Sequence, residues 1–195
     1  MRYQPAKIVG ILLFGCMILA AMNAHAESQR LIDQMKAGGH ILMIRHAMAP
    51  GSGDPENFQI GDCSTQRNLD DRGRSQARVI GEWLRSNGIK KARMFSSQWC
   101  RCQETAKLIN LGPVVQLPAL NSFYERPQDR EPNLKSLRIF LSEQTSKGEL
   151  LILVTHFVTI SEISGEAVSS GEGVVLRIKE NGAFEVAGRL DFGFR

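Results

Sequence analysis

The sequence predicts an α/β fold in three layers: a mostly parallel sheet with helices on both faces and a C-terminal antiparallel hairpin. Two apolar runs, residues 40–45 and 150–155, have the continuous hydrophobicity of strands that are buried on both faces. Segments with helical spacing alternate with the strand candidates, as in chains that form parallel sheets. Near the C-terminus, Asn181-Gly182 separates two short apolar runs, which is a strong hairpin pattern.

The other elements follow in chain order. A short amphipathic helix over residues 28–36 stops at Gly38-Gly39 and leads into the first strand. Residues 47–68 are rich in Gly, Pro, Asp and Ser and predict a loop whose length is typical of functional loops. We expect further helices over residues 70–87, 100–110 and 134–141, and further strands over residues 92–96, 114–117, 174–178 and 184–187.

Residues 1–26 have the pattern of a secretory signal peptide. Arg2 and Lys7 precede an apolar stretch over residues 8–22, and Ala24-His25-Ala26 supplies small residues for cleavage. We expect cleavage after Ala26, one domain over residues 27–195, a periplasmic or secreted location and no stable membrane insertion afterwards. A retained membrane anchor is the alternative, because the run is only somewhat shorter than about 20 residues. Lipid attachment at Cys16 is disfavoured, since apolar residues continue beyond it.

Charge gives no indication of a polyanionic partner. Without Arg2 and Lys7, 22 of the 24 Lys and Arg residues remain. Together with the 20 acidic residues they give residues 27–195 a net charge of only +2. The basic residues are not gathered in runs, which argues against nucleic acid as a partner.

Three cysteines remain after the predicted cleavage: Cys63, Cys100 and Cys102. Their spacing is poor evidence for a zinc site, because there is no second CxxC and no His pair. In an oxidising compartment we expect one disulfide, from Cys63 to Cys100 or Cys102, with a slight preference for Cys63–Cys100. A bond between Cys100 and Cys102 would be strained if Arg101 opens a helix.

Arginines and histidines follow the predicted strands where catalytic groups of such folds gather. Arg45 and His46 end the first apolar run, and His156 ends the other; Arg101 lies just beyond a third strand. Right-handed crossovers bring these strand ends to one edge of the sheet. Two guanidinium groups beside two imidazoles make an anion pocket that suits a phosphate monoester, because arginine matches phosphate oxygens in a bidentate way.

These residues lie in motifs that resemble the histidine phosphatase (phosphoglycerate mutase-like) superfamily, in its small form without a large cap domain. Leu42-Met43-Ile44-Arg45-His46-Ala47 is similar to its first motif, residues 96–106 to its second, and Val154-Thr155-His156 to its last. Residues 69–77, with Gly73 and Gln76, are similar to the start of its first long helix.

The resemblance implies a mechanism without metal or cofactor. His46 would attack phosphorus and become a phosphohistidine, while Arg45, Arg101 and His156 would hold the phosphate oxygens. His46 must then be unprotonated, and a protonated His156 would be more useful. Asp62, Arg67 and Asn68 are further candidates for substrate contact, although an ordinary loop role is the better interpretation.

The sequence departs from the family at Ala47 and Phe157, where glycine is usual, and at the acid position, which falls on Ser122. A leaving alkoxide needs a proton donor. We expect Glu125 to supply the proton, and Asp129 is the next candidate.

We therefore expect a phosphatase that acts on a small phosphorylated molecule or an envelope phosphate group. If no acid serves, only good leaving groups such as phosphoramidates or acyl phosphates would be cleaved well. The alternative is a non-catalytic phosphate-binding or envelope-interaction protein on the same fold, which Ser122 favours.

Overall fold

The structure is a computed structural model that describes residues 26–194, and the predicted signal peptide lies almost wholly outside this part of the chain. A helix over residues 26–37 precedes β1 (His40–Arg45). The later elements are η1 (Cys63–Thr65), α2 (Asp71–Ser86), β2 (Arg93–Ser96), α3 (Cys100–Ile109), β3 (Val114–Gln116), η2 (Pro118–Leu120), η3 (Pro127–Asp129), α4 (Arg130–Ser142), β4 (Leu151–Thr155), α5 (Phe157–Ser164), β5 (Gly173–Ile178) and β6 (Phe184–Leu190).

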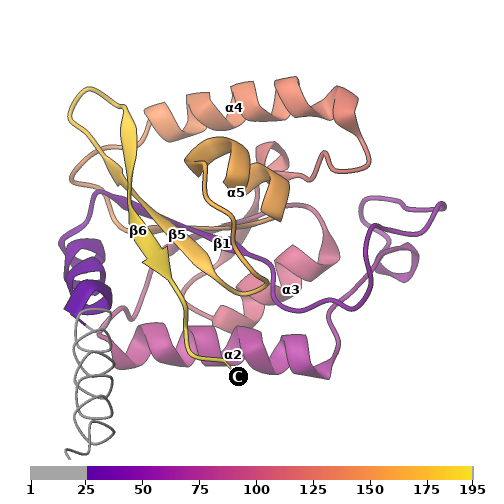
Figure 1. Ribbon diagram of the computed structural model, residues 1–195, viewed down its shortest axis with the longest axis horizontal. Coiled ribbons are helices and arrows are strands. Elements are labelled where there is room, and N and C mark those ends of the chain that lie inside the picture. The colour runs from indigo at the N-terminus through magenta and orange to yellow at the C-terminus, as the bar shows by residue number, and fades with distance from the viewer. Residues whose placement is uncertain (1–25, 195) are drawn as a thin grey trace, which may run out of the picture.

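The strands form one mixed sheet in the order β3-β2-β4-β1-β5-β6. The first four strands in this order are parallel, and β5 and β6 are antiparallel to their neighbours. In Figure 1, α4 and α5 lie above the sheet, and α2 and α3 lie below it. The predicted three-layer fold with its terminal hairpin is confirmed.

Strand β1 shows why a continuous apolar run predicts a central strand. Ile41 and Met43 pack in the core cluster that contains α4 and α5, whereas Leu42 and Ile44 pack against α2, α3 and the helix over residues 26–37. Successive side chains of a strand point to opposite faces, so only a strand with helices on both sides buries all four. All four are fully buried.

The hairpin of β5 and β6 is confirmed, but its connection is longer than the two-residue turn that Asn-Gly predicts. Residues 179–183 join the strands, and the Lys179 amide donates to the carbonyl oxygen of Ala183 at 2.7 Å. Gly182 has a φ of +77°, a backbone conformation that favours glycine, and the Asn181 side chain accepts a hydrogen bond from the Ala183 amide at 3.1 Å.

The sequence did not predict α5, which begins directly after His156. This helix is only eight residues long, and it contains β-branched and small side chains that give no amphipathic pattern. The short helices η1, η2 and η3 were not predicted either. Most predicted ends differ from the observed ones by one to three residues, and the helix predicted over residues 134–141 begins earlier, at Arg130.

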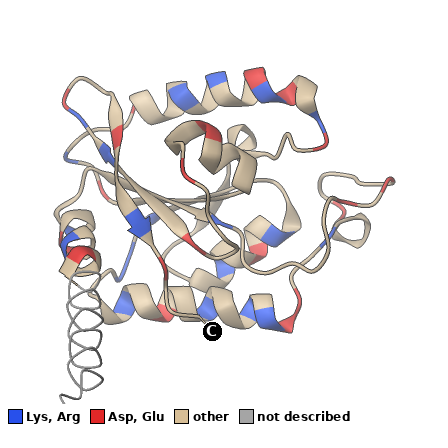
Figure 2. Ribbon diagram, viewed as in Figure 1, with Lys and Arg blue, Asp and Glu red and all other residues tan. Residues whose placement is uncertain are grey.

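Charged side chains of both signs are spread over the surface. Figure 2 shows Lys and Arg interspersed with Asp and Glu along both α2 and α4. Neither helix therefore presents a surface of one sign, which agrees with the small net charge.

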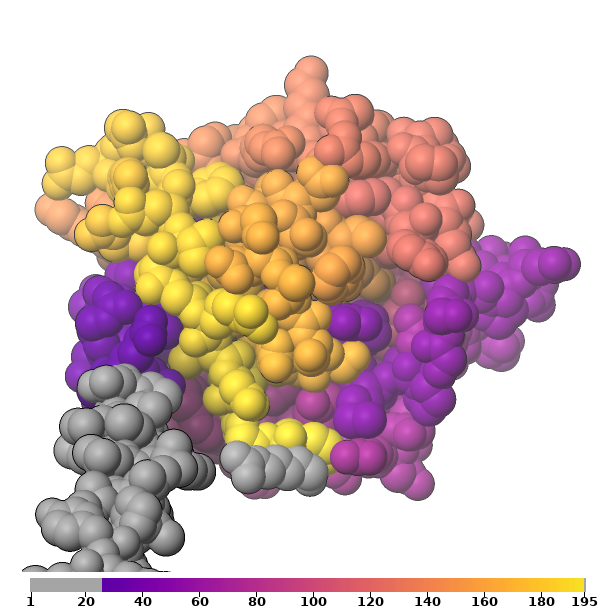
Figure 3. Space-filling model, in the orientation of Figure 1, coloured from indigo at the N-terminus to yellow at the C-terminus, as the bar shows by residue number. Residues whose placement is uncertain are grey.

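The loop over residues 47–68 is the most prominent irregular segment. It runs from the end of β1 to the start of α2 and forms a projecting lobe at the right-hand edge of the molecule (Figure 3). Residues 51–54 and Arg67 of this loop line the candidate site described next.

Candidate active site

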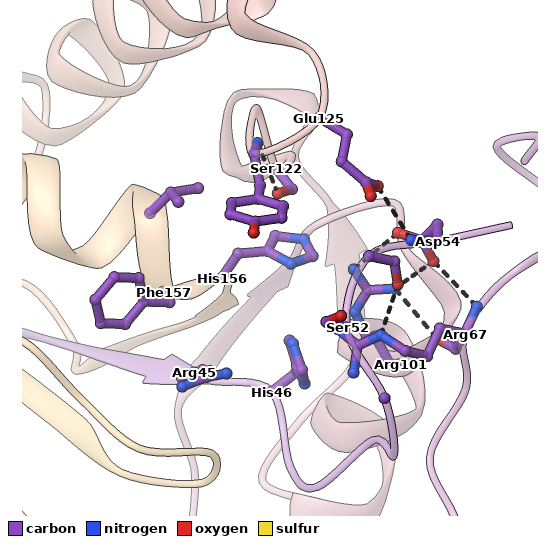
Figure 4. A pocket seen from close by; sticks show the side chains of 14 residues that line it. Arg45, His46, Ser52, Asp54, Arg67, Arg101, Ser122, Glu125, His156 and Phe157 are labelled. Atoms are coloured by element: carbon purple, nitrogen blue, oxygen red, sulfur yellow. Dashed lines mark hydrogen bonds and ion pairs between the residues drawn. The ribbon is translucent and has the colours of Figure 1, made fainter. Parts of the chain in front are cut away.

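The topology brings the predicted arginines and histidines together. Arg45 is paired with Thr155 across the parallel β1 and β4, so the residues that follow these strands, His46 and His156, lie side by side. Their ring centroids are 5.5 Å apart. Arg101, in the first turn of α3, completes the group at the same sheet edge (Figure 4).

These four residues line one cavity of about 380 Å³. Residues of the 47–68 loop form one wall, among them Asp54 and Arg67, and Glu125 contacts this wall through the Asp54 amide. Tyr124 and Phe157 also line the cavity. Tyr124 and Phe157 are exposed. The cavity thus has a buried cationic floor and a partly aromatic mouth.

His46 is buried and held in one tautomer. Its Nδ1 lies 2.8 Å from the carbonyl oxygen of Ala47, so Nδ1 carries the proton and donates it, and Nε2 keeps a free lone pair. Nε2 has no hydrogen-bond partner among the described residues. Burial, and then the positive charge of Arg101, lower the pKa of His46 to about 3. The imidazole is therefore neutral at physiological pH.

His156 differs from the expectation of a protonated group. Its Nε2 lies 2.9 Å from the Ser97 hydroxyl and 3.5 Å from the Cys102 sulfur. Complete burial and the nearby charge of Arg101 lower the pKa of His156 well below its ordinary value. In the free pocket it is thus neutral, and only an anion beside it would favour the protonated form.

Arg45 is held by a backbone carbonyl group from a distant segment and by an aromatic ring. Its Nη1 donates to the carbonyl oxygen of Val168 at 3.0 Å, and its guanidinium carbon lies 5.6 Å from the centre of the Phe157 ring. Its Nε is buried without a partner in the described part of the chain. Phe157, which replaces the usual glycine, thus contacts one of the anion-binding candidates.

Arg101 is paired with Asp54, a residue that the sequence analysis did not single out. Asp54 Oδ1 accepts from Nη1 at 2.7 Å and Oδ2 from Nη2 at 3.0 Å, and both side chains are less than a tenth exposed. Nη1 also donates to the carbonyl oxygen of Arg67 at 3.1 Å, whereas Nε of Arg101 is buried without a partner in residues 26–194.

Arg67 lines the pocket and also shapes the loop. Its Nε donates to Gly53 O at 2.7 Å and its Nη1 to Ala49 O at 2.6 Å. Asp62 and Asn68 do not line the cavity; Asp62 caps η1, and Asn68 donates to carbonyl groups of its own loop. Of these three loop candidates, only Arg67 is placed where a substrate could meet it.

Of the two candidate proton donors, the structure places only Glu125 at the cavity. Glu125 lines the cavity, and its Oε2 accepts a hydrogen bond from the backbone amide of Asp54 at 3.0 Å. Asp129 lies in η3 and does not line the cavity. Ser122 lines the cavity at the position where the family has its acid, and its hydroxyl accepts from the Tyr124 amide at 3.3 Å.

The preferred cysteine pairing is present. Cys63 and Cys100 form a disulfide with a Cα–Cα distance of 5.7 Å, and Cys102 is a buried free thiol. Burial raises the pKa of Cys102 to about 12. The disulfide joins the 47–68 loop to the first residue of α3.

Two kinds of feature are absent from the described part of the chain. Within residues 26–194, no three His, Cys, Asp or Glu side chains lie close enough together to hold a metal ion. Of the helices in the same range, none has the length and hydrophobicity needed to cross a membrane.

Part of the chain is similar to known protein phosphatases and to a family model. Residues 41–126 match the model of the Histidine phosphatase superfamily (branch 1). Over 74 residues, the chain is 39% identical to the mitochondrial serine/threonine-protein phosphatase Pgam5 of Drosophila virilis. That alignment covers 38% of this chain and 23% of the relative, so the chain matches only about a quarter of the relative's length.

Solved structures share the fold at low identity. The protein histidine phosphatase SixA, complexed with tungstate, aligns with a TM-score of 0.53 and 16% identity over 78% of this chain and 97% of SixA. Phosphoglycerate mutase from Plasmodium falciparum aligns with a TM-score of 0.51 and 16% identity over 79% of this chain and 89% of its own. Residues 41–126 are thus similar to the Histidine phosphatase superfamily (branch 1), and these solved structures share the fold of the chain.

Proposed function

We propose that the chain is a phosphatase that hydrolyses phosphate monoesters or phosphoramidates through a phosphohistidine on His46. The observation that carries this proposal is the state of His46: a neutral imidazole whose Nδ1 proton is donated to Ala47 O and whose Nε2 lone pair is free. An unprotonated nitrogen beside fixed positive charges is what nucleophilic attack on a phosphate requires.

The arginines supply matching sites for phosphate oxygens. A guanidinium has five N–H donors, and both Arg45 and Arg101 retain a buried Nε–H that no group in the described chain accepts. Leaving such a donor unpaired costs about 1–3 kcal/mol, and an oxyanion in the cavity would remove that cost. The SixA relative was solved with an oxyanion, tungstate, which agrees with this assignment.

The chemical steps follow from these groups. Nε2 of His46 attacks phosphorus, and the bond from phosphorus to the leaving oxygen or nitrogen breaks with its electron pair on the leaving atom. Glu125, at the mouth of the cavity, is the candidate that protonates an alkoxide. Water then attacks phosphorus and gives a proton to the Glu125 carboxylate, while the P–N bond breaks with its electron pair on Nε2. Inorganic phosphate leaves, and both His46 and protonated Glu125 are regenerated.

We further propose that the reaction needs no metal ion, because the guanidinium groups neutralise the charge on the transferred phosphoryl group. The substrate would be a small phosphorylated molecule or an envelope phosphate group. Export to the periplasm or the medium is supported by the signal-like pattern of residues 1–26 and by the Cys63–Cys100 disulfide, a bond typical of oxidising compartments.

A non-catalytic phosphate-binding protein is the second candidate. Ser122 stands at the family's acid position, and Glu125 is engaged by the Asp54 amide. Both observations weaken the case for cleavage of alkyl esters, but neither affects anion binding.

The test is hydrolysis of an aryl phosphate by the purified chain with a chelator present, for the native protein and His46→Ala. We expect turnover that survives the chelator and is lost in His46→Ala, together with an acid-labile phosphoenzyme in the native protein by mass spectrometry. Binding of inorganic phosphate without turnover would establish the second candidate instead. Export is tested separately, by the mass of the amino terminus after secretion; an intact residue 1 would disprove it.

A further inference from the structure

Asp54 is a carboxylate that pairs directly with an anion-binding candidate of the cavity, Arg101. It is the partner of Arg101 and lies on the loop wall of the cavity (Figure 4). A negative charge there weakens the attraction for a phosphate dianion, so its presence requires a compensating role.

All the acceptor positions of this carboxylate are engaged in the structure. Oδ1 accepts from Arg101 Nη1 and from the backbone amide of Arg67 at 3.0 Å. Oδ2 accepts from Arg101 Nη2 and from the Trp99 indole at 2.8 Å. Although burial alone would raise it, the hydrogen bonds and charge of Arg101 hold the pKa of Asp54 below its ordinary value. Asp54 is therefore an anion here and not a proton donor.

The hydrogen bonds of Arg101 show what this pairing achieves. Asp54 occupies the end of the guanidinium, one N–H from each terminal nitrogen, and Arg67 O takes the second N–H of Nη1. Of the five donors, only Nε–H and the second N–H of Nη2 remain. These two lie on the same edge of the planar group and form the side-on pair that can bind two oxygens of one phosphate.

We infer that Asp54 is a positioning residue: it fixes the plane of the Arg101 guanidinium so that this one edge is left for the phosphoryl oxygens. Trp99 and the Arg67 backbone hold the carboxylate in turn, from α3's N-cap position and from the loop. The inference rests on the proposed phosphatase function, since it assigns Arg101 to the transferred group.

The arrangement makes a specific kinetic prediction. In Asp54→Asn the amide cannot accept from both terminal nitrogens, so Arg101 loses its fixed plane. We expect kcat on an aryl phosphate to fall on the order of 10²-fold, as for other misplaced catalytic groups. Inorganic phosphate should bind no more weakly than to the native protein, because a negative charge has left the cavity.

Four variants test the inference. Asp62→Asn is the matched control: the same substitution on the same loop, at a side chain that caps η1 and does not line the cavity. Arg101→Gln and the double variant Asp54→Asn/Arg101→Gln show whether Asp54 acts through Arg101. We expect native kcat in Asp62→Asn and the same kcat in the double variant as in Arg101→Gln, because Asp54 has nothing left to position.

A measurement without turnover separates the two proposals. NMR relaxation measures the mobility of the Arg101 Nε–H group, whose signal is assigned by its loss in Arg101→Gln. This group should be rigid in the native protein and in Asp62→Asn, and mobile in Asp54→Asn. Three results would each overturn the inference. They are a native kcat in Asp54→Asn, an Nε–H group in Asp54→Asn that is as rigid as in the native protein, and a kcat of the double variant that is as far below that of Arg101→Gln as Asp54→Asn is below the native protein. Absence of turnover in the native protein would instead defeat the proposed function, and the NMR comparison would still decide the role of Asp54.

Discussion

Cys63 is bonded to Cys100, the residue that immediately precedes Arg101. The cross-link therefore fastens the far end of the 47–68 loop to the helical turn that carries an anion-binding candidate, while Asp54 fastens the near end to Arg101 itself. The loop wall of the cavity is thus tied to α3 by a covalent bond and by an ion pair, in addition to the hydrogen bonds from Cys100 N to Gln66 Oε1 and from Arg101 Nη1 to Arg67 O.

Removal of the disulfide should destabilise the protein. For a sequence separation of 37 residues, the chain-entropy relation gives a loss of about 4 kcal/mol in the free energy of unfolding for Cys63→Ser/Cys100→Ser. Urea titration of the native protein and the double variant measures it. Dithiothreitol should lower the native value to that of the variant and leave the variant unchanged; equal stability of the two oxidised proteins would contradict the prediction.

The buried His46 should make stability depend on pH. In the unfolded chain this histidine takes up a proton near its ordinary pKa of 6.5, whereas in the folded chain its pKa is lowered to about 3. Its contribution is therefore complete above pH 6.5 and falls by about 1.4 kcal/mol per pH unit between the two values.

Unfolding titrations of the native protein and His46→Asn between about pH 7 and pH 5, in buffer without phosphate, isolate this contribution. The variant should lose stability less steeply on acidification, since the carboxylates and His156 are common to both proteins. Identical slopes would mean that His46 is not held neutral by the fold.

Glu125→Gln should reveal the proton donor through the leaving group. Loss of a general acid typically costs about 10²–10⁴-fold, and that cost falls on alkyl phosphates, whose leaving oxygen needs a proton, far more than on aryl phosphates. The ratio of kcat/KM for the two substrates measures it. Asp129→Asn, at a residue that does not line the cavity, is the control and should leave the ratio unchanged. An equal effect of Glu125→Gln on both substrates would exclude this role.

Gly53→Ala should disturb Glu125 through the backbone. Gly53 has a φ of +68°, and an added Cβ would lie 2.2 Å from Oε1 of Glu125, so the carboxylate must move. Gly51 has a similar φ of +83°, but there the nearest atom is Arg67 Cδ at 3.7 Å. Both alanine variants should lose about 1–2 kcal/mol of stability from the left-handed backbone.

Only Gly53→Ala should also change the alkyl-to-aryl ratio of kcat/KM. Thermal unfolding and steady-state kinetics on the two variants give both quantities. A ratio that changes equally in both variants would show that loop strain, and not the position of Glu125, controls the proton transfer.

Sequence patterns predicted those parts of the molecule that depend on local periodicity. The apolar run before Arg45 identified a strand buried on both faces, and Asn181-Gly182 identified the hairpin, because each is specified by neighbouring residues. The rule that parallel strands end at one edge then brought His46 beside His156. These predictions required no knowledge of side-chain packing.

The contacts of the loop could not be predicted in this way. Asp54 meets Arg101 across 47 positions of sequence, from a segment without periodicity, and no spacing rule connects the two. The hydrogen bond from the Asp54 amide to Glu125 spans 71 positions and is equally invisible. The neutral state of His156 depends on complete burial against Ser97 and Cys102, which only the packed structure reveals.

The parallel pairing of β1 with β4 has a consequence for the timing of folding. His46 directly follows β1, the first strand to be synthesised, but its neighbour His156 follows a strand from much later in the chain. Contacts between such distant segments form slowly, because a long loop must close before they can be gained. An incomplete chain that ends before Leu151 would contain the candidate nucleophile without its partner, so the appearance of hydrolysis during refolding would report the joining of β4 and not the formation of β1.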